Sequence, residues 1–295
     1  MSMAGSTMAG AADGRRAVLA MCAGVLLLVL NDAVAKWLVE RYGPLQILFA
    51  RSLLALPLAG ALAWRLGGRA ALRSARPGVH ALRAALGVIA TVAFIAALDA
   101  LPLAEATALI LTAPLIVAAL AVPLLGEPIG RRRGVALAAG FAGALLVVRP
   151  GAAAFQPAAL LALAAASLYA LVMLAARRVD PRDGMWTMML HTTAFSALFA
   201  SAALAMPWPA PRGADLALFG ATALFGTLGV TLIGQAFRMA PAALVAPFDY
   251  TAIVWAGLLG WLVWGTVPGP WTWLGAAVIV AGGLLLVRAE AAGKG

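Results

Sequence analysis

Apolar runs of about 20 residues recur along the whole of this 295-residue chain. A helix rises about 1.5 Å per residue, so such a run is long enough to cross roughly 30 Å of hydrocarbon. Hydrophobic residues make up 64% of the chain and charged residues 11%, whereas soluble domains contain roughly 45–50% and about 25%. A water-soluble fold cannot bury so much apolar surface. The sequence therefore predicts an all-α polytopic membrane protein.

Proline, glycine and charge clusters divide the chain into ten predicted transmembrane helices. They cover residues 16–38, 44–64, 78–99, 102–122, 132–148, 157–176, 184–206, 214–237, 241–263 and 270–288. The first run, from Ala17, is too long for the apolar part of a signal peptide, so we expect it to be a retained span. The segments between the spans are too short to form a soluble domain.

Basic residues predict the orientation of these spans. Most of them fall on one side of the bundle, namely Arg15, Arg16, a group from Arg65 to Arg83, Arg131 to Arg133, and further residues after the sixth, eighth and tenth spans. The other side holds only Arg41, Arg149 and Arg212. The positive-inside rule then places both termini on the cytoplasmic side of the membrane, which we expect to be a bacterial inner membrane. This bias also accounts for the net charge of +10, so the expected partners are the lipid bilayer and a small-molecule substrate, not nucleic acid. We expect a monomer or a weak homo-oligomer.

An internal repeat relates the two halves. Shifting residues 98–149 by 139 positions, without a gap, superimposes several prolines, glycines and arginines. The matched pairs are Pro102 with Pro241, Thr112 with Thr251, Gly126 with Gly265, Gly143 with Gly282, and Arg149 with Arg288. We therefore expect a first repeat at 1–149 and a second at 150–295. Each repeat holds five spans, an odd number, so the second enters the membrane inverted. Inverted repeats are typical of secondary transporters, whose substrate site lies between the halves.

The segment VLNDAVAKWL, at residues 29–38, carries an acid and a base inside the first span. Asp32 and Lys36 lie four residues apart, on one face of a helix. Arg51 enters from the second span at a similar depth. An isolated charge at such depth costs on the order of 2.5–3.5 kcal/mol. The three residues are expected to form either an ion pair that joins two spans or an outer gate that meets a charged substrate.

Five further side chains are candidates for substrate binding or coupling near the midplane. They are Tyr169, His191, Asp249, Tyr250 and Trp255. An intramembrane carboxylate is a functional hypothesis by default, which singles out Asp249. His191 either bonds two helices together or faces the cavity and couples protons. Tyr250 and Trp255 either stack against an aromatic or cationic substrate or simply pack.

Three prolines interrupt predicted spans and are candidates for kinks or gates. They are Pro57, Pro114 and Pro247. Each frees a backbone carbonyl one turn earlier, and broken helices in both halves are where transporters build their sites. Merely curved, packed helices are the alternative.

Several long stretches resemble the drug/metabolite transporter superfamily, in its ten-helix EamA branch. The most specific are PLAEATALILTAPLIVAALAVPLLGEPIGRRRGVALAAGFAGALLV at 102–147 and its counterpart at 240–287. The second repeat departs from the first, since Gly265-Thr266-Val267 replaces Gly126-Glu127-Pro128. The resemblance implies transport. Members of this branch export amino acids, including aromatic ones in the YddG-like group, while other relatives take up riboflavin or S-adenosylmethionine.

The sequence contains no cluster of metal ligands, no paired catalytic carboxylates and no phosphate-binding loop. We therefore expect neither an enzyme nor a cofactor or metal site, and a carrier driven by a gradient rather than by ATP. A channel is disfavoured because no ring of repeated polar residues is evident. The predicted function is export of amino acids or related metabolites by alternating access. The alternative is uptake of a vitamin or nucleoside-like metabolite.

Overall fold

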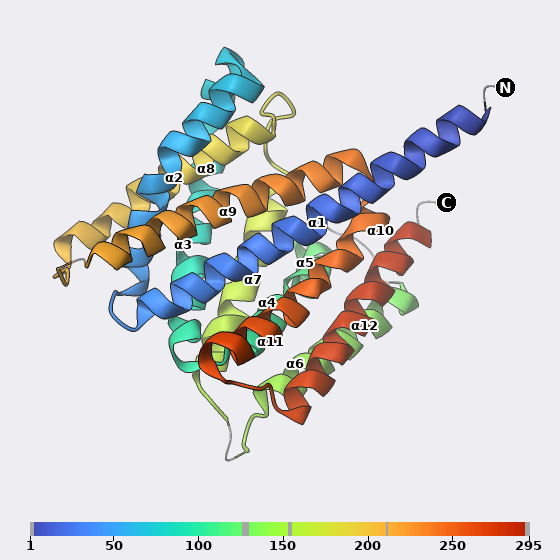
Figure 1. The fold of residues 1–295 in the computed structure, drawn as a ribbon. Coiled ribbons are helices and arrows are strands. Elements are labelled where there is room, and N and C mark those ends of the chain that lie inside the picture. The colour runs from blue at the N-terminus through green and yellow to red at the C-terminus, as the bar shows by residue number, and fades with distance from the viewer. Residues whose placement is uncertain (1–2, 126–129, 153–154, 211, 293–295) are drawn as a thin grey trace.

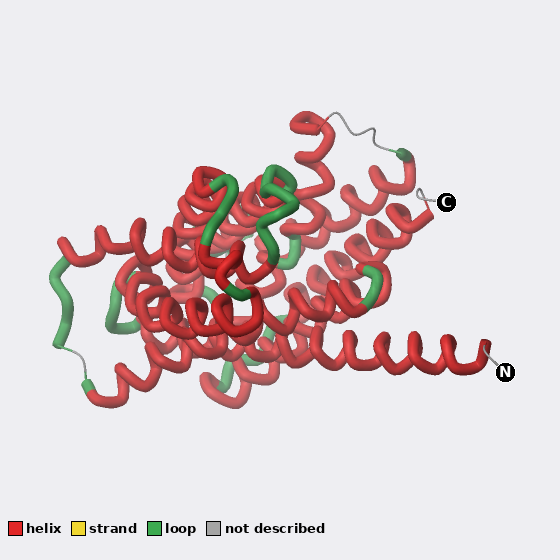
Figure 2. Tube along the Cα trace, turned by 90° about the horizontal axis from the view of Figure 1, so that it is seen from above, coloured by secondary structure: helices red, strands yellow, loops and turns green. Residues whose placement is uncertain are grey.

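The computed structural model describes residues 3–125, 130–152, 155–210 and 212–292, and over these ranges the chain is helical, with no strand (Figures 1 and 2). The first half contains α1 (Met3–Val39), α2 (Pro44–Gly67), the 3₁₀ turn η1 (Arg69–Leu72), α3 (Pro77–Ala100), α4 (Leu103–Ile110), α5 (Ala113–Leu125) and α6 (Arg131–Val148). The second half contains α7 (Ala158–Ala176), α8 (Met185–Ala200), η2 (Ser201–Ala205), α9 (Gly213–Met239), α10 (Ala242–Val245), η3 (Ala246–Tyr250), α11 (Thr251–Trp264) and α12 (Pro270–Ala292).

Nine helical segments of the described residues are long and apolar enough to cross a membrane. They coincide closely with nine of the ten predicted spans. The remaining prediction, 132–148, corresponds to α6, which is shorter and begins with three arginines. α6 follows α5 in the first half and packs along the membrane-spanning α12 of the second half (Figure 1), so it completes the first of two five-helix sets. The predicted all-α polytopic membrane fold is confirmed.

Two of the predicted spans are broken helices. The fourth divides into α4 and α5 just before Pro114, and the ninth divides into α10, η3 and α11 around Pro247. Proline lacks the N–H that continues a helical hydrogen-bond ladder, which explains why the breaks fall there. By contrast, α2 runs through Pro57 without interruption. The breaks thus occupy equivalent places in the two halves.

Each of the four most extensive helix–helix interfaces joins a helix of one half to a helix of the other. α2 packs on α8, α6 on α12, α1 on α9 and α3 on α7. In Figure 1, α2 runs beside α8, and α1 runs beside α9. The offset of 139 residues aligns α1, α2, α3 and α6 with α7, α8, α9 and α12, respectively. Under this alignment, the interface between α1 and α9 is equivalent to the interface between α3 and α7. The architecture is therefore two inverted five-helix repeats related by an approximate two-fold axis.

Glycines allow α6 and α12 to touch through their backbones. A Cβ atom on Gly143 would lie 2.7 Å from the carbonyl oxygen of Gly275, and one on Gly282 would lie 2.8 Å from the backbone nitrogen of Gly140. Small residues at helix interfaces permit this close approach in membranes. The matched glycines Gly143 and Gly282 of the repeat therefore meet a packing requirement on both helices.

We expect Gly143→Ala to lower the melting temperature of the protein in detergent. The new methyl group has no space against the α12 backbone, and such overpacking costs about 1–3 kcal/mol. Gly87→Ala in α3 is the matched control, because nothing lies within 4 Å of the added Cβ there. Thermal unfolding followed by tryptophan fluorescence measures both. Equal melting temperatures for the two variants would contradict the packing argument.

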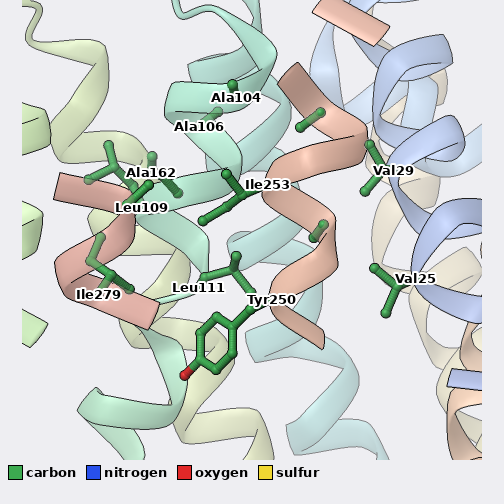
Figure 3. Packing of buried hydrophobic residues seen from close by; sticks show 14 of the residues in the cluster. Val25, Val29, Ala104, Ala106, Leu109, Leu111, Ala162, Tyr250, Ile253 and Ile279 are labelled. Atoms are coloured by element: carbon green, nitrogen blue, oxygen red, sulfur yellow. The ribbon is translucent and has the colours of Figure 1, made fainter. Parts of the chain in front are cut away.

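The main apolar core lies between the broken helices and their neighbours. Figure 3 shows side chains from α1, α4, α7, α11 and α12 meeting there, with the Tyr250 ring near Leu111 and Ile279. Because α4 belongs to the first half and α11 to the second, this core joins the two repeats.

Candidate substrate site and two latches

Polar side chains of α1 and α2 meet at a glycine of α9. Asn31 Nδ2 donates a hydrogen bond to Asp32 Oδ1 at 2.9 Å. A Cβ on Gly226 would lie 3.2 Å from Asn31 Oδ1 and 3.3 Å from the Arg51 guanidinium carbon. The Asp32 and Arg51 charges are close enough to interact electrostatically. Asp32 and Arg51 therefore lie together, as expected, and Gly226 makes the space for them.

Lys36 does not join these two residues, contrary to the three-residue cluster considered from the sequence. Its Nζ donates to the carbonyl oxygen of Leu98 and, at 2.8 Å, to that of Leu101. These carbonyls are at the C-terminal end of α3, which a cation stabilises. The ammonium also lies 5.8 Å from the centre of the Trp264 ring. Lys36 thus ties α1 to the end of α3.

A second polar group lies between α3, α7 and the broken helix of the second half. The Tyr169 side chain lies near both the Arg83 guanidinium and the Asp249 carboxyl. Arg83 Nε donates to the Val172 carbonyl at 3.5 Å, while its Nη1 is buried without a hydrogen-bond partner. Tyr169 retains 49% of its surface exposed. A cation, an anion and an accessible aromatic ring are therefore gathered in one place.

The other two aromatic candidates have different surroundings. Tyr250 is 9% exposed and belongs to the main apolar core (Figure 3). Its ring fits against α12 only because residue 283 is glycine, since a Cβ there would overlap the Tyr250 hydroxyl. Trp255 packs on the same core, and its indole N–H is buried without a partner. Tyr250 is therefore placed for packing, whereas Trp255 keeps an unused donor.

His191 lies against the other histidine of the chain, His80. The two ring centres are 5.5 Å apart. His191 Nδ1 donates to the carbonyl of Thr187, 3.0 Å away on the preceding turn, since a carbonyl only accepts. His80 is fully buried, and its Nε2 lies 3.0 Å from Asp183 Oδ2. His191 is thus adjacent to a contact between the two halves.

That contact, which we call the His80 latch, links the start of α3 and the segment before it to the segment between α7 and α8. Ser74 Oγ donates to Asp183 Oδ2 at 2.6 Å, and the backbone N–H of Ala75 donates to Asp183 Oδ1 at 3.0 Å. An ion pair between Arg76 and Asp180, at 3.8 Å, lies beside them. The latch therefore consists of Ser74, Ala75, Arg76 and His80 from the first half and Asp180 and Asp183 from the second.

The two carboxylates of the His80 latch, Asp180 and Asp183, stay ionised over the physiological pH range. Burial alone would raise the pKa of the Asp183 carboxyl, but the hydrogen bonds from Ser74, Ala75 and His80 outweigh burial and lower this pKa to about 2. Hydrogen bonds from Arg182 likewise lower the pKa of Asp180. A lowered carboxyl pKa stabilises the latch fully above about pH 4, and this stabilisation is lost as the pH falls towards 2.

A second contact, the Tyr42 latch, links the α1–α2 turn and the start of α2 to the start of α9 and the segment before it. Tyr42 Oη donates to Asp215 Oδ2 at 2.7 Å, and Arg41 Nε lies 3.8 Å from the same oxygen. Arg41 also donates to the Ala210 carbonyl at 2.7 Å, and Gln46 Nε2 donates to the Pro207 carbonyl at 2.9 Å. The Tyr42 latch therefore consists of Arg41, Tyr42 and Gln46 from the first half and Pro207, Ala210 and Asp215 from the second.

The two latches are equivalent under the internal repeat, but the acid and the base of the ion pair exchange places between the two halves. The offset of 139 residues converts Arg41 into Asp180 and Arg76 into Asp215. The ion pair Arg41–Asp215 of one latch thus becomes Asp180–Arg76 of the other, and both measure 3.8 Å. Because the repeats are inverted, the two latches lie at opposite ends of the bundle. The halves are therefore clasped by equivalent contacts at each end, around the polar groups between them.

Several of these residues were not identified from the sequence. Arg83 was grouped with the basic residues of the preceding link, although its position six residues into an apolar helix is itself a signal. His80, Asp183 and Asp215 lie near span ends, where a charge is unremarkable. The latches depend on pairings between residues 103–173 positions apart, which local patterns do not contain.

The fold and site define the class of protein: a membrane transporter built from two inverted five-helix repeats, with polar side chains on its spans and contacts between the halves at each end. The chain belongs to the EamA-like transporter family, whose profile matches it twice, at residues 15–149 and 156–288.

Three relatives resemble the chain over most of its length. A riboflavin transporter of Rhizobium johnstonii is 32% identical and covers 91% of this chain and 89% of its own. A riboflavin transporter of Vibrio cholerae is 36% identical over 73% of each chain. An S-adenosylmethionine uptake transporter of Rickettsia bellii is 27% identical and covers 88% of this chain and 89% of its own. These relatives do not support the expected likeness to amino-acid exporters in particular.

Proposed function

We propose that the chain is an inner-membrane uptake carrier for a riboflavin-like vitamin, a planar heteroaromatic ring with a polyhydroxyl chain. The observation that carries this proposal is the similarity to two riboflavin transporters, at 32% and 36% identity. The sequence alone predicts export of amino acids, with vitamin uptake as the alternative. The relatives favour the alternative.

The chemistry of the polar group formed by Arg83, Tyr169 and Asp249 supports such a substrate. A flavin ring presents carbonyl oxygens, an imide N–H and an aromatic face. The guanidinium of Arg83 donates to carbonyl oxygens, the carboxylate of Asp249 accepts from N–H or hydroxyl groups, and the exposed ring of Tyr169 offers a stacking surface. Each functional group of the ligand class thus has a counterpart.

Transport by alternating access then requires the two latches to open in turn. With both termini cytoplasmic, as the basic residues predict, the His80 latch closes the cytoplasmic end and the Tyr42 latch closes the external end. Each latch joins one repeat to the other, so rocking one half against the other breaks one latch and preserves its counterpart.

A cationic nucleoside of the S-adenosylmethionine type is the second candidate. The Rickettsia relative supports it, and so does the presence of two acids, Asp32 and Asp249, between the halves. An adenine ring stacks on Tyr169 as readily as a flavin does, so the charge of the substrate is the distinguishing property.

Counterflow into proteoliposomes tests the proposal. Vesicles preloaded with unlabelled riboflavin are expected to accumulate labelled riboflavin with saturable kinetics, and S-adenosylmethionine and tryptophan are expected to compete weakly. Counterflow driven by S-adenosylmethionine or tryptophan, but not by riboflavin, would replace the proposed substrate. Flux that rises linearly with concentration would indicate a channel and overturn the carrier itself.

A further inference from the structure

A basic cavity of about 440 Å³ lies between the start of α6 and the end of α12, away from the polar groups between the halves. It is lined by Arg131, Arg132, Val135, Leu285, Arg288 and Ala289. α6 belongs to the first repeat and α12 to the second, so a ligand in this cavity would contact both halves of the carrier.

The cavity gathers positive charge that no acid of the described residues neutralises. Arg131, Arg132 and Arg288 have no hydrogen-bonded or ion-paired acid within the part of the chain that the structure describes, and the first turn of α6 carries no acid. Two of these cations lie at a helix N-terminus, where the helix dipole disfavours positive charge. The orientation rule explains arginines at this end of the bundle, but it does not require three of them to face one cavity. Their convergence points to an anionic ligand, and the guanidinium fork is well matched to phosphate oxygens.

The wall of the cavity changes from charged to apolar within one helical turn. Val135 follows Arg131 by one turn and is 63% exposed, and Leu285 precedes Arg288 by one turn and is 44% exposed. A free phosphate ion would gain nothing from these apolar side chains. A phospholipid would place its phosphate among the arginines and the first carbons of its acyl chains against Val135 and Leu285. We propose that this cavity binds the headgroup of an anionic phospholipid of the surrounding membrane.

The repeat supplies a comparison within the same molecule. At the equivalent place at the other end of the bundle, the offset of 139 residues converts Arg288 into Arg149, but it converts Arg131 and Arg132 into Pro270 and Trp271. Two of the three cations are therefore absent from the equivalent place. The basic cavity is thus confined to one leaflet and is not a by-product of the repeat. The bound lipid would hold the α6–α12 pair together, which is the contact made by Gly143 and Gly275.

Lipid-dependent thermal stability of the purified full-length protein tests this proposal. Phosphatidylglycerol is expected to raise the melting temperature by several degrees more than phosphatidylcholine does. The triple variant Arg131→Gln, Arg132→Gln, Arg288→Gln is expected to lose at least half of that difference. A triple variant at the exposed end of α2 and in the link before α3, Arg65→Gln, Arg69→Gln, Arg73→Gln, removes the same charge and is expected to keep the difference. Arg288→Gln alone, on the opposite wall from the other two arginines, is a milder second variant and is expected to lose part of the difference.

The outcomes separate the ligand sources. Inorganic phosphate at the same phosphate concentration is expected to give little stabilisation. A full stabilisation by inorganic phosphate would show a site for a free anion and overturn the lipid proposal. Equal losses in the two triple variants would show a general charge effect and would also overturn it, as would an undiminished phosphatidylglycerol effect in the cavity variants. The measurement uses no transport substrate, so it is independent of the proposed vitamin uptake.

Discussion

Asp249→Asn is expected to lower the efficiency of substrate uptake roughly 10- to 150-fold, while the protein still reaches the membrane and unfolds at a similar temperature. Asp249 lies in η3, within the polar group shared with Arg83 and Tyr169. It makes no hydrogen bond or ion pair with another described residue, so the substrate or a proton is left to supply its partner. Losing a charge-assisted hydrogen bond weakens binding by about 1.5–3 kcal/mol, which corresponds to that factor.

Glu105→Gln is the matched control for this prediction. Glu105 is also an acid within a predicted span, but it already accepts a hydrogen bond from Thr272 Oγ1 at 2.9 Å. An amide oxygen accepts that bond equally well, so uptake by this variant is expected to match the wild type. Initial rates of labelled riboflavin uptake over a range of concentrations provide the measurement. Wild-type kinetics in Asp249→Asn would remove Asp249 from the substrate site, whichever vitamin is carried.

The membrane fold was predictable because its cause is local. The hydrocarbon thickness fixes how long an apolar run must be, so span positions follow from counting residues. The breaks near Pro114 and Pro247 lie at two of the three proline candidates, since a missing N–H acts within one turn, whereas α2 continues through the third, Pro57. The repeat was predictable because an offset without gaps preserves prolines and glycines that the packing requires, such as Gly143 and Gly282.

The arrangement of charges was less predictable, because it depends on which chain ends meet. Asp32 lies one turn from Lys36 on the same helix, yet Lys36 Nζ donates to backbone carbonyls at the C-terminal end of α3. The sequence of α1 alone does not show which helix end lies next to Lys36. The Asp183 carboxylate gathers three donors from a segment more than 100 residues earlier. Tyr250 is a candidate for substrate stacking from the sequence, and the structure seats its ring against Gly283 of α12, a contact that the local sequence does not contain.

Breaking the two latches one at a time is expected to shift the carrier in opposite directions. Asp183→Ala leaves Ser74, Ala75 and His80 without their acceptor and favours the state open at the His80 latch. Asp215→Ala removes the acceptor of Tyr42 and favours the state open at the Tyr42 latch. Loss of hydrogen bonds to a charged group is worth about 1.5–3 kcal/mol, so each variant is expected to change the ratio of the two states roughly 10- to 150-fold.

A single reporter cysteine measures this shift from both sides of the membrane. Tyr169→Cys in a Cys22→Ser background places the only thiol between the halves, where an impermeant maleimide reaches it through whichever end is open. Asp183→Ala is expected to speed labelling in inside-out vesicles and slow it in intact cells, and Asp215→Ala is expected to do the reverse. Glu40→Ala, which removes an exposed charge next to the Tyr42 latch, is expected to change neither rate.

The double variant Asp183→Ala, Asp215→Ala gives the sharpest test, because the repeat makes the two latches equivalent. If each latch stabilises one state by a similar free energy, removing both leaves the ratio of states near that of the wild type. The barrier between the states also falls, since neither contact has to be broken. The double variant is then expected to label from both sides at nearly balanced and faster rates. Labelling that follows only one of the single variants would show that the latches differ in strength and that a single end controls access.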